Sequence, residues 1–87
     1  MKDYETEEVA KILIEWNPLG DDAKKIKDLN GYRTEAIDII SGLTIYKNRM
    51  SAENIIKEVL NQAFGLNLTE YECIAPTQKI LNVLNKS

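Results

Sequence analysis

The sequence predicts an all-α protein, a small bundle of about four helices with a short extra helical turn after a Trp-Asn-Pro corner. Apolar residues recur at helical spacing in four stretches, and glycine or proline stands near the ends of most of them. The chain has 87 residues, of which 44% are hydrophobic. One helical domain with a single core is therefore expected over residues 1–87.

The first helix is expected from about Tyr4 to Trp16. One face of it is formed by Val9, Ile12, Leu13 and Trp16, at i, i+3, i+4 and i+7. Pro18 lacks a backbone N–H and pushes Asn17 out of the α region, so the helix should end at Trp16. Gly20 can then take a positive φ and turn the chain.

A short helix or helical turn is expected at 21–29, where Asp21 is a suitable N-cap. The next full helix is expected from about Tyr32 to Ser41. Its apolar face consists of Tyr32, Ala36, Ile39, Ile40 and Leu43. Residues 41–50 are expected to form a connection that is locally extended at 44–46.

Ser51 is the expected N-cap of the third helix, and Gly65 ends it at the C′ position. The apolar stripe between them comprises Ile55, Ile56, Val59, Leu60, Ala63 and Phe64. Thr69 and Glu72 form a capping box that starts the last helix. Pro76 falls inside that helix, which predicts either one kinked helix or two short ones. We favour the kinked helix.

The charge and cysteine content narrow the classes of function. The net charge is −3, from 14 acidic against 11 basic residues, which argues against nucleic acid and anionic membrane as partners. The first residues, MKDYETEEVAK, lack the apolar run of a signal peptide, and no stretch approaches the roughly 20 apolar residues of a membrane span. Cys73 is the only cysteine, which favours a cytoplasmic location.

Catalytic and metal-binding patterns are missing from the sequence. Histidine is absent, which excludes Ser-His-Asp and Cys-His arrangements and the usual zinc ligand sets. No glycine-rich phosphate loop occurs, and no acidic residues have the spacing of a calcium loop. Cys73 is expected to be a small buried side chain instead of a nucleophile. We therefore expect no enzyme activity, no cofactor and no metal.

Three stretches of the chain resemble the YugE-like family of small bacterial proteins, a family built on a domain of unknown function: EWNPLG, GYRTEAIDIISGL and SAENIIKEVLNQAFG. The matching positions are Trp16, Pro18, Leu19, Gly20, Tyr32, Glu35 and the segment 51–65. Asn17 stands where the family usually has aspartate, and Gly31 and Arg33 stand where it has acids. The resemblance implies a small all-α fold without an assigned activity, and suggests protein binding by analogy with immunity proteins of toxin systems.

Spacing and resemblance together predict a structural clasp at the corner, made by Trp16, Asn17, Pro18, Gly20, Tyr32 and Glu35. The ring of Tyr32 is expected to lie against Trp16. The carboxylate of Glu35 is expected to accept hydrogen bonds from backbone amides of the 17–20 turn. The alternative is that the same residues form a binding site for a partner.

The favoured function is a protein-binding or regulatory module. The resemblance suggests an immunity-like protein, and a homodimer is compatible with this function. One alternative is a helix-turn-helix-like unit at 21–43, whose phosphate contacts would come from Lys24, Lys25, Lys27 and Arg33. The other alternative is a small-ligand carrier with a groove between helices.

Overall fold

The structure is a computed structural model that describes residues 2–20, 30–46 and 48–86, and all regular secondary structure within these ranges is helical. Four α-helices follow in the order α1 (Lys2–Trp16), α2 (Arg33–Tyr46), α3 (Ala52–Phe64) and α4 (Glu70–Lys86), with a short 3₁₀ helix, η2 (Asn30–Tyr32), directly before α2. The prediction of an all-α bundle is confirmed. The short helix predicted at 21–29 lies outside the described residues.

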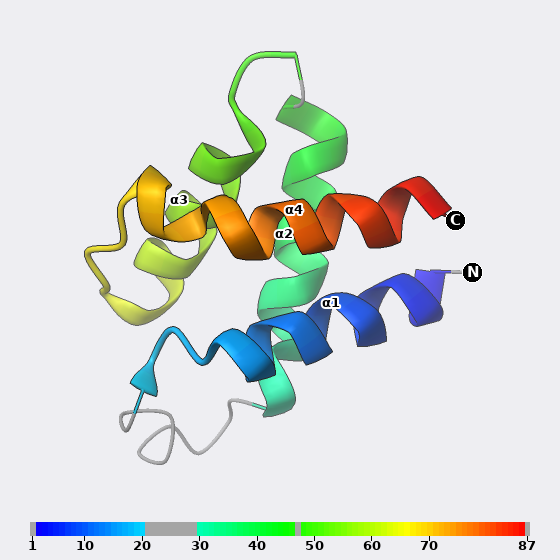
Figure 1. The fold of residues 1–87 in the computed structure, drawn as a ribbon, viewed down its shortest axis with the longest axis horizontal. Helices are drawn as coiled ribbons and strands as arrows, with labels where there is room; N and C mark the ends of the chain where they lie inside the picture. The colour runs from blue at the N-terminus through cyan, green and yellow to red at the C-terminus, as the bar shows by residue number, and fades with distance from the viewer. Residues whose placement is uncertain (1, 21–29, 47, 87) are drawn as a thin grey trace.

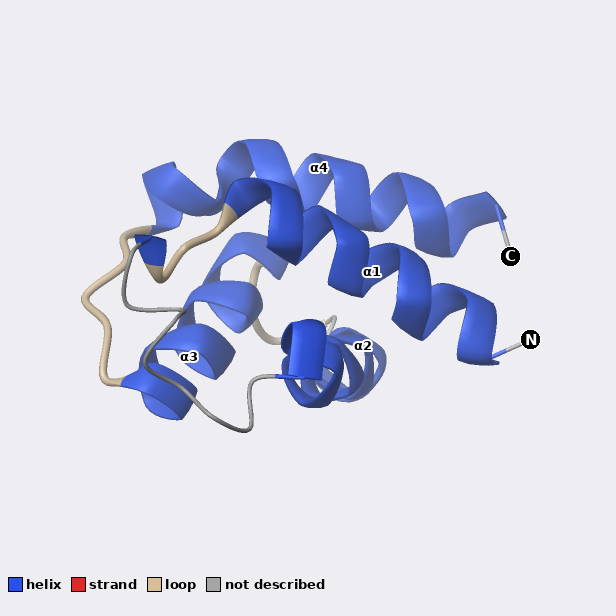
Figure 2. Ribbon diagram, turned by 90° about the horizontal axis from the view of Figure 1, so that it is seen from below, coloured by secondary structure: helices blue, strands red, loops and turns tan. Residues whose placement is uncertain are grey.

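The four helices form two antiparallel pairs (Figure 1). Helix α1 lies beside α4, and α2 lies beside α3. Figure 2 shows that the α1–α4 pair lies as a layer over the other pair and that α2 runs across this layer. Helix α1 also packs on α2, and α3 packs on α4, so each helix contacts two others. The first turn of α1 and the last turn of α4 lie at the same side of the bundle (Figure 1).

All four helices contribute side chains to one core. Its fully buried members include Val9 and Leu13 from α1, Ala36 and Ile39 from α2, Ile56 and Leu60 from α3, and Cys73 and Ile80 from α4. Burying a side chain of the size of leucine or isoleucine contributes about 1.5–3 kcal/mol. The helical periodicity of the sequence selects these residues because only one face of each helix points inward.

Helix α1 ends as predicted, at the residue before Asn17. Asn17 takes a left-handed conformation with φ of 51°, and its N–H donates to the carbonyl of Leu13 at 2.8 Å. Asparagine is one of the few residues other than glycine that accept this position at a helix end. Gly20 has φ of 59°, and its N–H donates to the Asn17 carbonyl at 2.9 Å, which closes the corner.

Helix α2 is longer than predicted, because it continues to Tyr46 through the region that we expected to be a connection. The expectation of an extended segment at 44–46 is wrong. The sequence predicts a helix end at Ser41, directly before Gly42, but this glycine is an interior residue of α2 that lies against α3. A Cβ atom at this position would lie only 2.9 Å from Cγ2 of Ile55. The glycine therefore permits close helix packing and does not terminate the helix.

The predicted caps of α3 and α4 are confirmed. The Ser51 hydroxyl accepts a hydrogen bond from the Asn54 N–H at 3.1 Å, and Gly65 ends α3 with φ of 64°. In the capping box, the Thr69 hydroxyl accepts from the Glu72 N–H at 3.2 Å, and the Glu72 carboxylate accepts from the Thr69 N–H at 3.0 Å. Helix α4 runs through Pro76 as one helix and is not split into two.

Candidate functional site

The corner after α1 is held to the start of α2 by the side chains of Asn17 and Tyr32. The Tyr32 hydroxyl donates to Oδ1 of Asn17 at 3.3 Å. The amide nitrogen of Asn17 donates to the Gly20 carbonyl, also at 3.3 Å. One asparagine side chain thus closes its own turn and receives the tyrosine from a residue 15 positions later. The sequence did not predict this contact, although both residues belong to the predicted clasp.

Tyr32 is only 2% exposed and has a left-handed backbone, with φ of 61°. This conformation is uncommon for a bulky residue, and surrounding contacts must hold it in place. The ring packs edge to face on Phe64 of α3, with 6.0 Å between the centroids. Among the described residues, this is the ring pair that the structure forms, and it joins Tyr32 to Phe64 instead of Trp16. The ring reaches across to α3 because α2 and α3 are neighbours.

Trp16 packs at the edge of the core, where it is partly buried. It lines a small hollow together with Ala75 and Pro76 of α4. Pro18 is half-buried, and Gly20 is exposed. The tryptophan therefore covers the contact between α1 and α4, while Asn17 and Tyr32 make the hydrogen bond between the corner and α2.

Glu35 does not hold the 17–20 turn, and that prediction is wrong. The residue is 9% exposed, and its Oε1 atom has no hydrogen-bond partner. Burial raises the pKa of the carboxyl above its ordinary value, its own backbone N–H lowers it, and the nearby Asp38 raises it further. The side-chain hydrogen bond from this part of the chain to the corner comes from the hydroxyl of Tyr32, three residues before Glu35.

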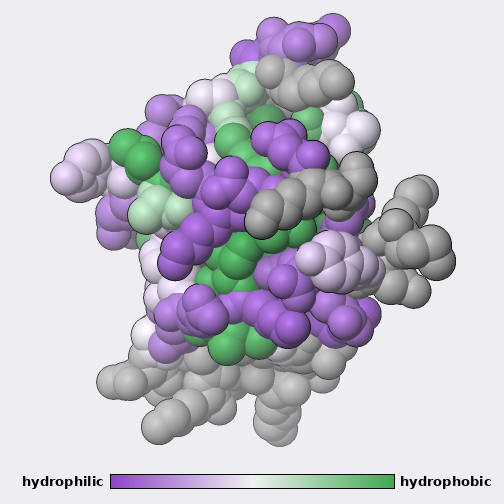
Figure 3. Space-filling view, turned by 45° about the vertical axis from the view of Figure 1, so that its right-hand side comes forward, coloured by the Kyte–Doolittle hydropathy of each residue, from purple (hydrophilic) through white to green (hydrophobic). Residues whose placement is uncertain are grey.

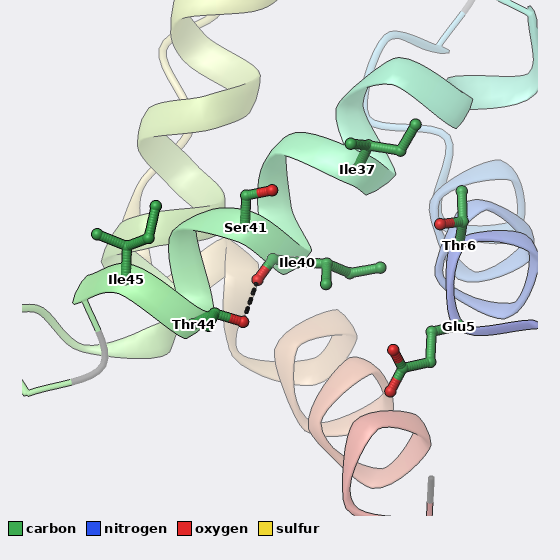
Figure 4. Close-up of a pocket in the computed structure, with 7 residues that line it drawn as sticks. All are labelled: Glu5, Thr6, Ile37, Ile40, Ser41, Thr44 and Ile45. Carbon is green, nitrogen blue, oxygen red and sulfur yellow. Dashed lines mark hydrogen bonds between the residues drawn. The ribbon is translucent and has the colours of Figure 1, made fainter. Parts of the chain in front are cut away.

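A groove runs along the outer side of α2 and occupies about 590 Å³ (Figure 4). Its α2 side is lined by Ile37, Ile40, Ser41, Thr44 and Ile45. The opposite side is formed by Glu5 and Thr6 of α1. The Thr44 hydroxyl donates to the Ile40 carbonyl at 2.9 Å, so its hydrogen is engaged within α2. The groove floor thus offers methyl and methylene groups with few free hydrogen-bond donors.

Two of the three isoleucines that line the groove are exposed to solvent, and the third, Ile40, is partly buried. Ile37 is 52% exposed and Ile45 is 67% exposed, while Ala36, Ile39 and Leu43 of the same helix are buried in the core. Helix α2 is therefore apolar on two sides, one inside the bundle and one outside. Figure 3 shows apolar side chains between polar ones on the side of the molecule that carries the two termini. Contiguous exposed apolar surface of this kind is typical of interaction sites.

One carboxylate lines the groove, and a second lies next to its α2 residues. Glu5 extends from α1 with its carboxylate toward the space beside α2 (Figure 4). Asp38 is exposed on α2, three residues before Ser41 and seven before Ile45, so helical spacing places it beside these two residues, on the side away from Glu5 and outside the groove lining. The ion pairs between described residues lie elsewhere and join Lys11 to Glu8, Arg33 to Glu7, and Lys57 to Glu58. Neither of the two carboxylates is neutralised by a cation in the described part of the chain.

The thiol of Cys73 lies in the core and lines neither the corner nor the groove. Cys73 is fully buried, and burial raises the pKa of its thiol to about 11, so the nucleophilic thiolate is scarce at neutral pH. Within residues 2–20, 30–46 and 48–86, no three acidic or cysteine side chains come together in a way that could hold a metal ion. None of the helices in these ranges is long and apolar enough to cross a membrane.

Sequence reasoning missed the groove. The signal that could have found it is the second apolar stripe in RTEAIDIISGLTIY, where Ile37 and Ile45 fall outside the face of Ala36, Ile39 and Leu43. A helix with apolar residues on all sides is expected to be covered on all sides. The helix that the sequence predicts ends at Ser41, so the prediction does not include Ile45.

Comparison of the chain with protein-family models, with curated proteins and with solved structures found no match. The resemblance to the YugE-like family stays a prediction.

Proposed function

We propose that this chain is a protein-binding module and that the groove along α2 is its contact surface. The observation that supports the proposal is the exposure of Ile37 and Ile45, at 52% and 67%, on a helix whose opposite face is already in the core. Covering such side chains removes apolar surface from water, at about 25 cal/mol per Å². Because Cys73 is the only cysteine, we place the module in the cytoplasm.

In this proposal the corner residues have a structural role. The polar atoms of Asn17 and Tyr32 bond to each other and to Gly20, and the Tyr32 ring is buried against Phe64. These groups have little left to offer to a partner. The groove, in contrast, contains Ile37 and Ile45, which the fold leaves exposed, and it lies along a helix that is packed on both α1 and α3.

Site-specific crosslinking tests the proposal. A photo-reactive amino acid is placed at Ser41, in the groove, and at Tyr71 as a control, an exposed position on α4. Crosslinked peptides are identified by mass spectrometry after illumination in source cells. We expect one protein to be captured reproducibly from Ser41, and to be lost when Ile37 and Ile45 are both changed to aspartate. Equal capture from both positions would exclude the groove as the contact surface.

A small ligand is the second candidate occupant of the groove. The volume of about 590 Å³ lies within the range of ligand pockets, about 300–1,000 Å³. A ligand that binds only the native state raises the melting temperature. Screening of small apolar compounds by melting temperature, on the parent chain and on the Ile37→Asp, Ile45→Asp variant, separates this candidate from a protein partner.

A further inference from the structure

The groove has edges of one charge sign and a floor without charge. Its floor contains Ile37, Ser41 and Ile45, each four residues from the next on α2. Ile37 and Ile45 are therefore separated by about 12 Å along the helix axis, with the small Ser41 between them. An α-helix laid along α2 can place apolar side chains on both isoleucines and approach closely at the serine. This is the pattern of anchors by which grooves receive amphipathic helices.

The charges on the two edges decide which helix fits. Glu5 lines the groove on the α1 edge. Helical spacing places the exposed Asp38 beside Ser41 and Ile45, on the opposite edge of the isoleucine stripe. The ion pairs between described residues supply no cation to either carboxylate. A helix with basic residues on both sides of an apolar stripe would place positive charge opposite both carboxylates. A helix with acidic residues there would meet like charges, which costs binding free energy and suppresses wrong partners.

A second copy of this chain does not meet that requirement. A symmetric dimer across this face would pair α2 with α2 of the other copy. In the antiparallel arrangement, the Glu5 edge faces the other Glu5 edge, and the Asp38 edge faces the other Asp38 edge. In the parallel arrangement, the Glu5 edge faces the Asp38 edge. Both arrangements oppose acidic residues to acidic residues, so the face is not self-complementary in charge.

We infer, on the basis of the function proposed above, that the groove receives a basic amphipathic helix of a partner protein. The apolar stripe of that helix covers Ile37 and Ile45, and its basic side chains lie against Glu5 and Asp38. The bound species is thus defined by its chemistry: about two to three helical turns that carry large aliphatic residues on one face and lysine or arginine on both flanks.

Two designed peptides test this inference. Both have an alanine-rich helix with leucine at i, i+4 and i+8; one carries lysine on both flanks of the leucines and the other carries glutamate. Binding is measured by fluorescence anisotropy near physiological salt. We expect the lysine peptide to bind and the glutamate peptide not to bind. Equal affinity of the two peptides would overturn the inference.

Variants of the chain separate groove binding from general attraction to an acidic protein. Glu5→Gln with Asp38→Asn should weaken binding of the lysine peptide about tenfold, which corresponds to the loss of two edge contacts. The matched control, Glu15→Gln with Glu70→Gln, changes the net charge equally at exposed positions outside the groove and should leave the affinity unchanged. If both double variants weaken binding alike, the peptide does not sit in the groove and the inference fails.

The two proposals can fail separately. If Ser41 crosslinks to a protein but the lysine peptide does not bind, the groove is a protein-binding site and its partner is not a basic helix. Sedimentation of the parent chain gives the second distinction. A dimer that dissociates on Ile37→Asp would show that the occupant is a second copy, and would overturn the inference of a basic partner.

Discussion

Tyr32, the last residue of η2, and Glu35, in the first turn of α2, lie three residues apart, and they differ in whether their buried polar atoms have hydrogen-bond partners. The Tyr32 hydroxyl donates to Asn17, whereas Oε1 of Glu35 has no hydrogen-bond partner. A buried hydrogen bond contributes about 0.5–1.5 kcal/mol, and a buried polar atom without one costs about 1–3 kcal/mol. The tyrosine therefore stabilises the corner, while the ionised glutamate works against it.

Removing the Tyr32 hydroxyl should lower the free energy of unfolding. We expect Tyr32→Phe to cost about 0.5–1.5 kcal/mol, because the ring stays on Phe64 while the bond to Asn17 is lost. Urea unfolding of Tyr32→Phe, Asn17→Ala and the double variant should reveal a coupling energy of about 0.5–1 kcal/mol between the two residues. Tyr71→Phe, at a position that is 83% exposed, is the control and should change nothing. Strictly additive effects would show that the bond does not contribute.

Glu35 should make stability depend on pH. Its pKa is raised in the folded chain, so above the ordinary value of 4.5 the folded state binds more protons than the unfolded state. The free energy of unfolding therefore falls as pH rises through the interval between the ordinary and the raised pKa. Glu35→Gln removes this loss, and we expect the variant to gain about 1 kcal/mol over the parent chain at pH 7.

The measurement is urea unfolding of both proteins at a series of pH values. The gain of Glu35→Gln should vanish below the ordinary carboxyl pKa of 4.5, where both states of the parent chain are protonated. Glu15→Gln, at an exposed position of α1, controls for the change in net charge. A difference in free energy of unfolding between Glu35→Gln and the parent chain that stays constant over the whole pH range would contradict the proposed destabilisation by ionised Glu35.

At the scale of elements, α2 shows how a residue that breaks helices in isolation can be required inside one. Gly42 costs helix propensity relative to alanine, about 1 kcal/mol. It lets α2 approach α3 so closely that a Cβ would lie 2.9 Å from the Ile55 side chain. Ile55 is itself only 3% exposed and has little room to move. Packing between the two helices therefore outweighs propensity within one of them.

Gly42→Ala should accordingly destabilise the protein, although it improves helix propensity. We expect a net loss of about 1–2 kcal/mol, since the added methyl group forces α2 and α3 apart. Ser41→Ala is the matched control, because Ser41 is the exposed neighbour on the same helix and has no such contact. Thermal unfolding should show a lower melting temperature for Gly42→Ala only. A higher melting temperature for Gly42→Ala would mean that the helices separate without cost.

At the scale of the whole molecule, the two antiparallel pairs share one core and leave one helix with a second apolar side. Helix α2 packs inward with Ala36 and Ile39 and faces outward with Ile37 and Ile45. The corner after α1 is hydrogen-bonded internally, so it stabilises the fold, and the groove on α2 contains apolar side chains that are exposed to solvent. The proposed function thus depends on the side of α2 that the bundle does not cover.

Local chemistry in the sequence was enough to predict the all-α class, the face of each helix that is buried and most helix ends. Asn17-Pro18, Ser51, Gly65 and the Thr69–Glu72 box act through backbone geometry and hydrogen bonds within a few residues. Such interactions join residues that are close together in the sequence, so they can be predicted without knowledge of the tertiary structure. The structure confirms each of these ends.

Only the tertiary structure decided how far α2 extends, which ring meets Tyr32 and where the apolar groove lies. Gly42 is compatible with a helix end until Ile55 is known to lie against it, and Phe64 becomes the partner of Tyr32 only when α3 packs beside α2. The hydrogen bonds predicted between Glu35 and the backbone of the 17–20 turn are not formed. These contacts join residues far apart in the chain, and their energies depend on how helices pack, which periodicity within one helix does not specify.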